Sequence, residues 1–229
     1  MAGEITVLLI DELGLRLEDA AAINFTDTFK LEALNKAQYQ LANMLHNSYL
    51  TELEVEQTAI DWSGIAATGY EYNNVDTGLT SKPIFRGGQG VLKVGVGWGA
   101  PATTYIWATQ IDLQKIKRVE NTYLVGSDAN PLFYVFKNFI FASVTTYTLL
   151  KGKVLYHQFP TTMTTTADPS LNSSFHNLIV SLAEGMCWAM DNKLDRRNAV
   201  LKAAFDEIKV LNEKVTPAPG VGTQGRRRQ

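Results

Sequence analysis

Apolar residues recur with the period of a helix near the C-terminal end of the chain, from residue 173 to residue 212. They form two stripes, each with polar residues on the opposite side. The first stripe consists of Phe175, Leu178, Ile179, Leu182, Met186, Ala189 and Met190, and the second of Val200, Leu201, Ala204, Phe205, Ile208 and Leu211. Asp195 lies between them, where its carboxylate is a candidate N-cap for the second helix. The pattern predicts two helices joined by a short polar turn and packed antiparallel.

Trp188 does not fit this pattern. It lies among Asn177, Ser181, Glu184 and Asp191, roughly 160° from the first apolar stripe at about 100° per residue. A tryptophan on a polar helix face is either an outlier or part of an interface with another molecule.

Two more helices are predicted near the N-terminus. Residues 4–17 are rich in apolar side chains, but their period is mixed and Gly14 interrupts it, so we predict a short helix, with a strand as the alternative. A longer helix follows, with Thr26 or Asp27 as its N-cap. Its apolar stripe is Leu31, Leu34, Leu41, Met44 and Leu45, opposite Glu32, Lys36, Gln40, Asn43 and Asn47.

Between the two helical regions, the pattern changes to that of strands. Residues 53–60 alternate with period two, and the following residues, 61–83, have the composition of a loop. Further short runs are rich in aromatic and β-branched residues. These runs are 91–96, 105–107, 111–120, 122–125, 132–136, 139–145 and 153–158. They predict a small antiparallel sheet or sandwich.

The predicted fold is therefore α+β, with a β domain inserted into a small helical bundle. The N-terminal helices occupy residues 1–50, the β-rich insertion 51–167 and the C-terminal helical hairpin 168–213. Residues 214–229 contain prolines, glycines and three arginines but no apolar face, so we predict a flexible basic tail.

Charge separates this tail from the rest of the chain. The formal net charge is −2, and because Arg226, Arg227 and Arg228 supply three positive charges, the residues before them carry −5. That body should not attract nucleic acid. The arginines themselves could contact phosphates, dock on a protein partner or remain disordered.

Residues that could carry chemistry are few and scattered. His46, His157 and His176 fall in different predicted elements and lack the spacing of a metal motif, so we interpret them as surface or core histidines. The lone Cys187 excludes an intrachain disulfide and is expected to be an inert, partly buried thiol. Glycines that could suggest a phosphate loop are flanked by strand-like sequence and are expected at turns, bulges or loop ends. They are Gly87, Gly88, Gly90, Gly95, Gly97 and Gly99.

From these residues we expect no catalysis, no metal and no cofactor. No apolar run approaches the roughly 20 residues that span a membrane, and no basic leader precedes Glu4, so we also expect a soluble chain without a membrane anchor or secretory signal.

The order of these elements resembles the head-to-tail adaptor, or connector, proteins of tailed bacteriophages, including tail tubular protein A. The resemblance spans residues 4–213 and rests on patterns in the second helix, the insertion and the hairpin. They are Phe25, Thr26, Asp27, Leu34, Asn35 and Ala37, then the segments 111–120 and 153–160, and finally the Ala-rich region 183–208 with Asp195, Arg196 and Arg197.

The resemblance implies a structural protein of the virion neck, made in the host cytoplasm. Such subunits form a ring, usually of twelve copies, beneath the portal protein; genomic DNA passes through the lumen, and a further tail protein attaches below. It implies a subunit interface at Trp188, Asp195, Arg196 and Arg197, and contacts of Arg226, Arg227 and Arg228 with portal or DNA.

Two other functions remain as alternatives. A carbohydrate-binding or adhesion module would use Trp62, Trp98 and Trp107 as an aromatic platform on an exposed sheet face. A hydrolase would require one of the three histidines to meet a carboxylate in a cleft.

Overall fold

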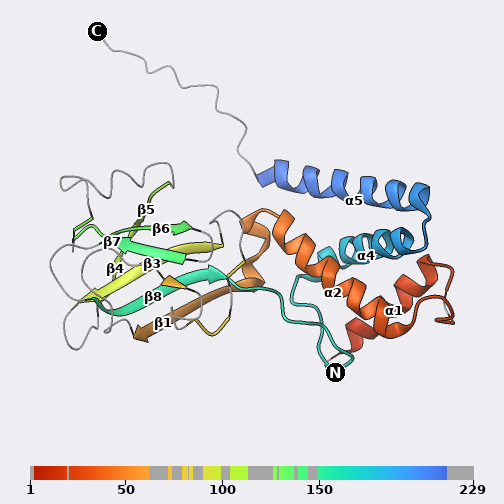
Figure 1. Ribbon diagram of the computed structural model, residues 1–229, viewed down its shortest axis with the longest axis horizontal. Coiled ribbons are helices and arrows are strands. Elements are labelled where there is room, and N and C mark those ends of the chain that lie inside the picture. The colour runs from red at the N-terminus through yellow and green to blue at the C-terminus, as the bar shows by residue number, and fades with distance from the viewer. Residues whose placement is uncertain are drawn as a thin grey trace, which may run out of the picture. The chain divides into compact units, whose positions relative to one another are not determined.

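A computed structural model (Figure 1) describes residues 3–19, 21–61, 72–73, 79–81, 83–84, 90–98, 104–112, 126–127, 129–136, 139–143 and 149–215. The chain is α+β and divides into two compact units. Unit 1 comprises Met1–Thr51 and Pro160–Gln229, and unit 2 comprises Glu52–Phe159.

The N-terminal helices of unit 1 are α1 (Glu4–Arg16) and α2 (Asp27–Met44). The predicted short helix is therefore confirmed, and the strand alternative is wrong. Thr26 caps α2, because its side chain accepts a hydrogen bond from the backbone N–H of Phe29. Short 3₁₀ turns follow at Asn47–Tyr49 and Thr51–Leu53.

The C-terminal hairpin consists of a 3₁₀ turn (Ser173–Phe175), α4 (His176–Met190) and α5 (Leu194–Val215). Helix α4 packs against α1, α2 and α5, so it is enclosed on several sides. Gly185 permits the close approach of α5, because a Cβ atom there would lie 2.4 Å from Leu201 Cδ2. At the far end of α5, Asn212 accepts from the N–H of His46 and donates to the carbonyl of Met44, which fixes α5 to the end of α2.

The segment 160–167, which the sequence analysis assigned to the β insertion, lies with the helices instead. Thr6 Oγ1 donates to the carbonyl of Ala167 at 2.8 Å, and Gln38 Nε2 donates to that of Thr161 at 3.1 Å. Just beyond the segment, Asp168 Oδ1 accepts from the N–H groups of Ile5 and Thr6 and so caps α1. These long-range polar contacts, invisible in a hydrophobic pattern, decide where the segment packs.

Unit 2 contains two sheets. In the first, β1 (Glu54–Asp61), β8 (Leu149–His157), β3 (Val91–Trp98) and β4 (Ile106–Trp107) lie in the order β1-β8-β3-β4, with antiparallel neighbours. In the second, the order is β2-β7-β6-β5, formed by β2 (Tyr72–Asn73), β7 (Phe139–Ser143), β6 (Leu132–Phe136) and β5 (Thr109–Gln110).

The two sheets share a core made of alternate residues from their strands. It comprises Ile60, Val91, Val94, Val96, Phe133, Val135, Val154 and Tyr156. Because successive residues of a strand point to opposite faces, Lys93, Gly95 and Lys153 belong to the outer face of the first sheet.

The antiparallel β domain predicted for the insertion is confirmed, and within it only the pair β5 and β6, among the described strands, is parallel. The glycine prediction is wrong in part, because Gly95 lies inside β3, paired on both sides. The predicted strand 122–125 and most of the predicted strand 111–120 lie outside the described residues, as do Gly87, Gly88, Gly99 and Trp62.

Candidate subunit interface

Trp188, predicted on the polar face of the first C-terminal helix, lies near the end of α4, and it is only 2% exposed. The indole Nε1 donates to Glu184 Oε1 at 3.1 Å. Two cations cover the ring from the same chain: Lys193 Nζ lies 4.8 Å from the ring centroid and Arg196 Cζ lies 5.0 Å from it. Trp188 therefore packs within its own chain and does not present the exposed ring that was predicted for a subunit interface.

The physical reason is that α4 does not have a single buried face. Its buried residues include Val180, Ala183 and Cys187 in addition to the predicted stripe, because neighbouring helices enclose it. Conversely Met190, predicted to lie in the core, is exposed at the end of the helix. An apolar stripe predicts the buried side of a helix that packs against one neighbour, whereas α4 packs against α1, α2 and α5.

The other residues predicted at this interface lie in the first turn of α5. Asp195 is exposed inside this turn, since α5 begins at Leu194, so the expected N-cap role is wrong. Arg196 is half-exposed and lies 3.2 Å from Glu18 Oε1 besides covering Trp188, while Arg197 is partly buried. Arg226, Arg227 and Arg228 lie outside the described residues.

Helix α1 instead carries an exposed apolar row that the sequence analysis did not assign. Leu8 is 60% exposed and Leu15 is 69% exposed, and because they are seven residues apart they lie on one side of the helix. Ile5 and Val7 flank them and are also exposed. We call Glu4, Leu8, Asp11 and Leu15, which share this side, the α1 outer face. The mixed period of residues 4–17 was its signal, since α1 has apolar residues on both faces.

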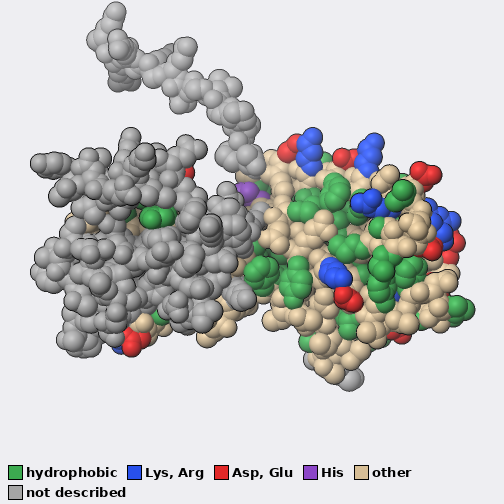
Figure 2. Space-filling view, in the orientation of Figure 1, with side chains coloured by type: hydrophobic (Ala, Val, Ile, Leu, Met, Phe, Trp, Pro, Cys, Tyr) green, Lys and Arg blue, Asp and Glu red, His purple; other side chains and the backbone are tan. Residues whose placement is uncertain are grey.

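A second exposed apolar feature lies along α5. Leu194 and Phe205 are 53% and 41% exposed and lie about 20° apart around the helix. Phe205 was predicted in the core, but the buried side of α5 is centred on Ala204 and Ile208. We call Leu194, Phe205, Lys202 and Lys209 the α5 edge. Charged side chains of both signs line the outer side of α5 in Figure 2.

Both faces carry charged side chains around their apolar residues. The α1 outer face contains the exposed carboxylates of Glu4 and Asp11, whereas lysines at 202 and 209 border the apolar residues of the α5 edge. The ion pair of Lys209 with Glu213 is long, 3.9 Å, and exposed to solvent. Both faces therefore offer apolar side chains for contact, and on the α5 edge the exposed acids Asp206 and Glu213 lie beside the lysines.

The histidines considered for catalysis have different surroundings. His46 is exposed at a turn and its Nδ1 lies 2.9 Å from Ser48 Oγ, whereas His176 Nε2 lies 3.3 Å from the carbonyl oxygen of Leu171. His157 is buried in unit 2. Burial, with Glu184 nearby, raises the pKa of Cys187 to about 11, which makes the thiol a poor nucleophile.

In the part of the chain that the structure describes, no three His, Cys, Asp or Glu side chains come together in a way that could hold a metal ion. None of the helices described there has the length and apolar character to cross a bilayer. Comparison with known proteins finds no family model that matches this chain, and no curated protein matches its sequence.

Proposed function

We propose that this chain is a head-to-tail adaptor subunit of a tailed bacteriophage, a structural protein without catalytic activity. Copies would form a closed ring, usually of twelve in the proteins that it resembles, between the portal and the next tail protein in the virion neck. Genomic DNA would pass through the lumen without sequence-specific binding. The net charge of −5 before the terminal arginines supports a lumen that does not hold phosphate tightly.

The observation that carries this proposal is the α1 outer face. A helix of a self-sufficient subunit would place polar residues there, yet Leu8 and Leu15 are mostly exposed. Each such side chain gains about 1.5–3 kcal/mol when it is fully buried, so a contact covering several of them favours association.

A closed ring requires that one face of a subunit meets a different face of its neighbour. The α1 outer face and the α5 edge are two different faces within one unit, and each presents exposed apolar side chains. We therefore assign them to opposite sides of the subunit contact. A permanent interface of about 2,000 Å² or more would include further surface around this centre.

The experiment is sedimentation velocity of the full chain, alone and mixed with the portal protein of the same phage. Wild-type protein should form a particle of several hundred kilodaltons with portal, and Leu8→Glu with Leu15→Glu should abolish it while circular dichroism stays unchanged. Lys36→Glu, on the exposed side of α2, is the control and should assemble normally. Failure of the wild-type protein to associate with portal at any concentration would contradict the proposal.

A further inference from the structure

The outer face of the first sheet in unit 2 holds an exposed tryptophan in a defined setting. Gly95 of β3 pairs with Trp107 of β4 on one side and with Lys153 of β8 on the other, so these three positions share a face. The neighbouring positions Val94 and Val154 point into the core. Trp107 is therefore on the face that the core does not use, and it is 44% exposed.

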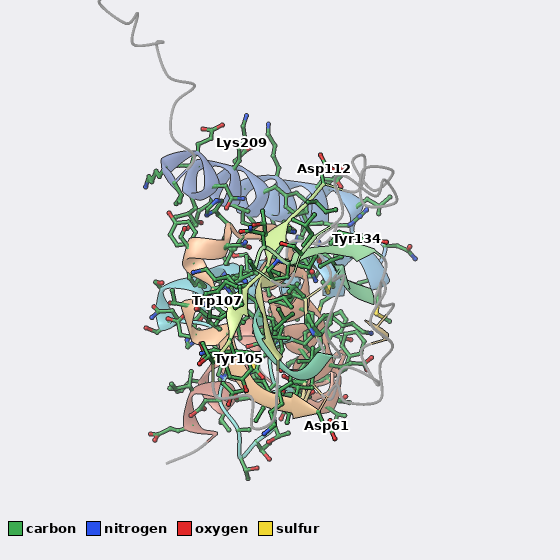
Figure 3. All side chains as sticks on the ribbon, turned by 90° about the vertical axis from the view of Figure 1, so that its left-hand side faces the viewer. Asp61, Tyr105, Trp107, Asp112, Tyr134 and Lys209 are labelled. Atoms are coloured by element: carbon green, nitrogen blue, oxygen red, sulfur yellow. The ribbon has the colours of Figure 1, made fainter. Side chains whose placement is uncertain are left out.

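Gly95 provides the space in which the indole lies. A Cβ atom at this position would come 3.3 Å from Trp107 Cε3 and 3.4 Å from Cζ3, so the ring lies directly against the glycine and would have to shift by a few tenths of an ångström to make room for a side chain. Tyr105 precedes Trp107 by two residues, and its hydroxyl accepts a hydrogen bond from the N–H of Ala59 at 3.1 Å. Figure 3 labels both residues, Trp107 in β4 and Tyr105 just before it. The aromatic surface is thus held in place by backbone contacts.

Charged groups surround the ring. Lys153 Nζ lies 5.3 Å and Lys93 Nζ 5.9 Å from the Trp107 centroid. Lys153 is also paired with Glu56 Oε1 at 2.8 Å. Lys93 is exposed, and within the described residues its recorded contact is with the indole alone. Among the residues that the structure describes, a donor, an acceptor and a lysine without an ion-pair partner therefore border an exposed aromatic face.

We propose that this face binds an acidic oligosaccharide, with a sugar ring stacked on Trp107. The C–H face of a pyranose matches an indole, and sugar hydroxyls both donate and accept, which suits the Lys153–Glu56 pair. A carboxylate on the sugar would meet Lys93. Single-stranded nucleic acid also stacks on aromatics, but it needs a continuous positive groove. Glu56, and Asp61 paired in register with Lys151, interrupt such a groove here.

This inference does not depend on ring assembly, because every group in it lies in unit 2 of a single chain. The test is isothermal titration of the full chain with a hexuronate tetrasaccharide, a neutral glucose tetrasaccharide and a thymidine dodecanucleotide. We expect the hexuronate to bind and Trp107→Ala to weaken it at least about tenfold, which corresponds to about 1.4 kcal/mol. Trp107→Phe should recover part of the affinity, and circular dichroism should verify that both variants fold.

Two further measurements fix the roles of the charges. Lys93→Gln should reduce the preference for the acidic over the neutral sugar, whereas Lys36→Gln on α2 should change neither affinity. Absence of hexuronate binding at millimolar concentration would overturn the proposal, as would binding that Trp107→Ala leaves intact. Tighter binding of the dodecanucleotide than of either sugar would also overturn it and assign the face to nucleic acid.

Discussion

The side chain of Asn35 forms two hydrogen bonds with the backbone of Met163, 128 residues later in the chain. Its Nδ2 donates to the Met163 carbonyl at 3.0 Å, and its Oδ1 accepts from the Met163 N–H at 2.7 Å. Both residues are buried. The amide satisfies both backbone hydrogen-bonding groups of Met163, as a neighbouring strand would, and so holds the segment 160–167 against α2.

Removing this amide should therefore destabilise unit 1. Asn35→Ala leaves a buried N–H and a buried carbonyl without partners, so we expect a loss of about 2–3 kcal/mol in the free energy of unfolding. Urea denaturation measures it. Asn43→Ala is the matched control. The Asn43 amide is exposed and donates to the Tyr39 carbonyl of its own helix. Equal effects of the two substitutions would contradict the role assigned to Asn35.

Trp188 should affect stability far more than its predicted place on a polar face implies. Trp188→Ala removes a buried indole that Lys193 and Arg196 cover, and we expect a loss of about 3–5 kcal/mol. Met190→Ala, at an exposed position of the same helix, should cost little. If Trp188→Ala unfolds like the wild type but fails to assemble, the indole belongs to the interface after all.

Asp19 should make the protein sensitive to acid. The N–H of Phe25, followed by those of Asn24 and Ile23 and the charge of Lys30, lowers the pKa of this carboxyl below its ordinary value of 3.8. A lowered pKa in the folded state means that the stabilisation is present above 3.8 and is lost as the pH falls through the folded pKa. Asp19→Asn should thus be less stable than wild type at neutral pH, and the difference should vanish in strong acid.

Urea midpoints measured from neutral to strongly acidic pH test this prediction. Asp11→Asn is the control, since Asp11 is exposed on α1. A difference between wild type and Asp19→Asn that stays constant with pH would show that the carboxylate charge is not responsible.

Cys187 should not react with thiol reagents until the protein unfolds. Because its pKa is raised to about 11 and its side chain is buried, the native protein should hardly react with a thiol reagent at mildly alkaline pH. In denaturing urea the reagent should modify one thiol per chain, as the sequence contains a single cysteine. Rapid reaction of the folded protein would show that α4 is less enclosed than described.

The proposed pairing of the two faces can be tested by cross-linking. In a Cys187→Ala background, Leu15→Cys and Phe205→Cys proteins should form a disulfide when mixed with portal, because each assembled contact brings α1 against α5. Cross-links within either protein alone, at equal or greater yield, would indicate a symmetric contact between identical faces instead.

The sequence predicted the positions of the helices better than the contacts that each helix and strand makes in the folded chain. Periodicity located α2, α4 and α5, and apolar content indicated α1 despite its mixed period. Thr26 or Asp27 was predicted to cap α2, and Thr26 does so; such a cap can be predicted because it depends on neighbouring residues only. Partners far along the chain could not be predicted in this way. The contacts of Asn35, the pairing of β5 with β6 and the enclosure of α4 all depend on residues that folding brings together.

The candidate interface illustrates the same limit. A single tryptophan on a polar face pointed to an interface, yet the adjoining turn covers it. The exposed leucines of α1 were not singled out, because the mixed period of residues 4–17 does not separate an inner from an outer face. That mixture is what a helix with two apolar faces produces.

The central proposal, a ring built through the α1 outer face, is tested most directly by cryo-electron microscopy of the full chain bound to portal. We predict a closed ring in which Leu8 and Leu15 of each copy are buried against a different face of the next copy. Isolated subunits, or a particle in which α1 leaves both leucines in solvent, would contradict it.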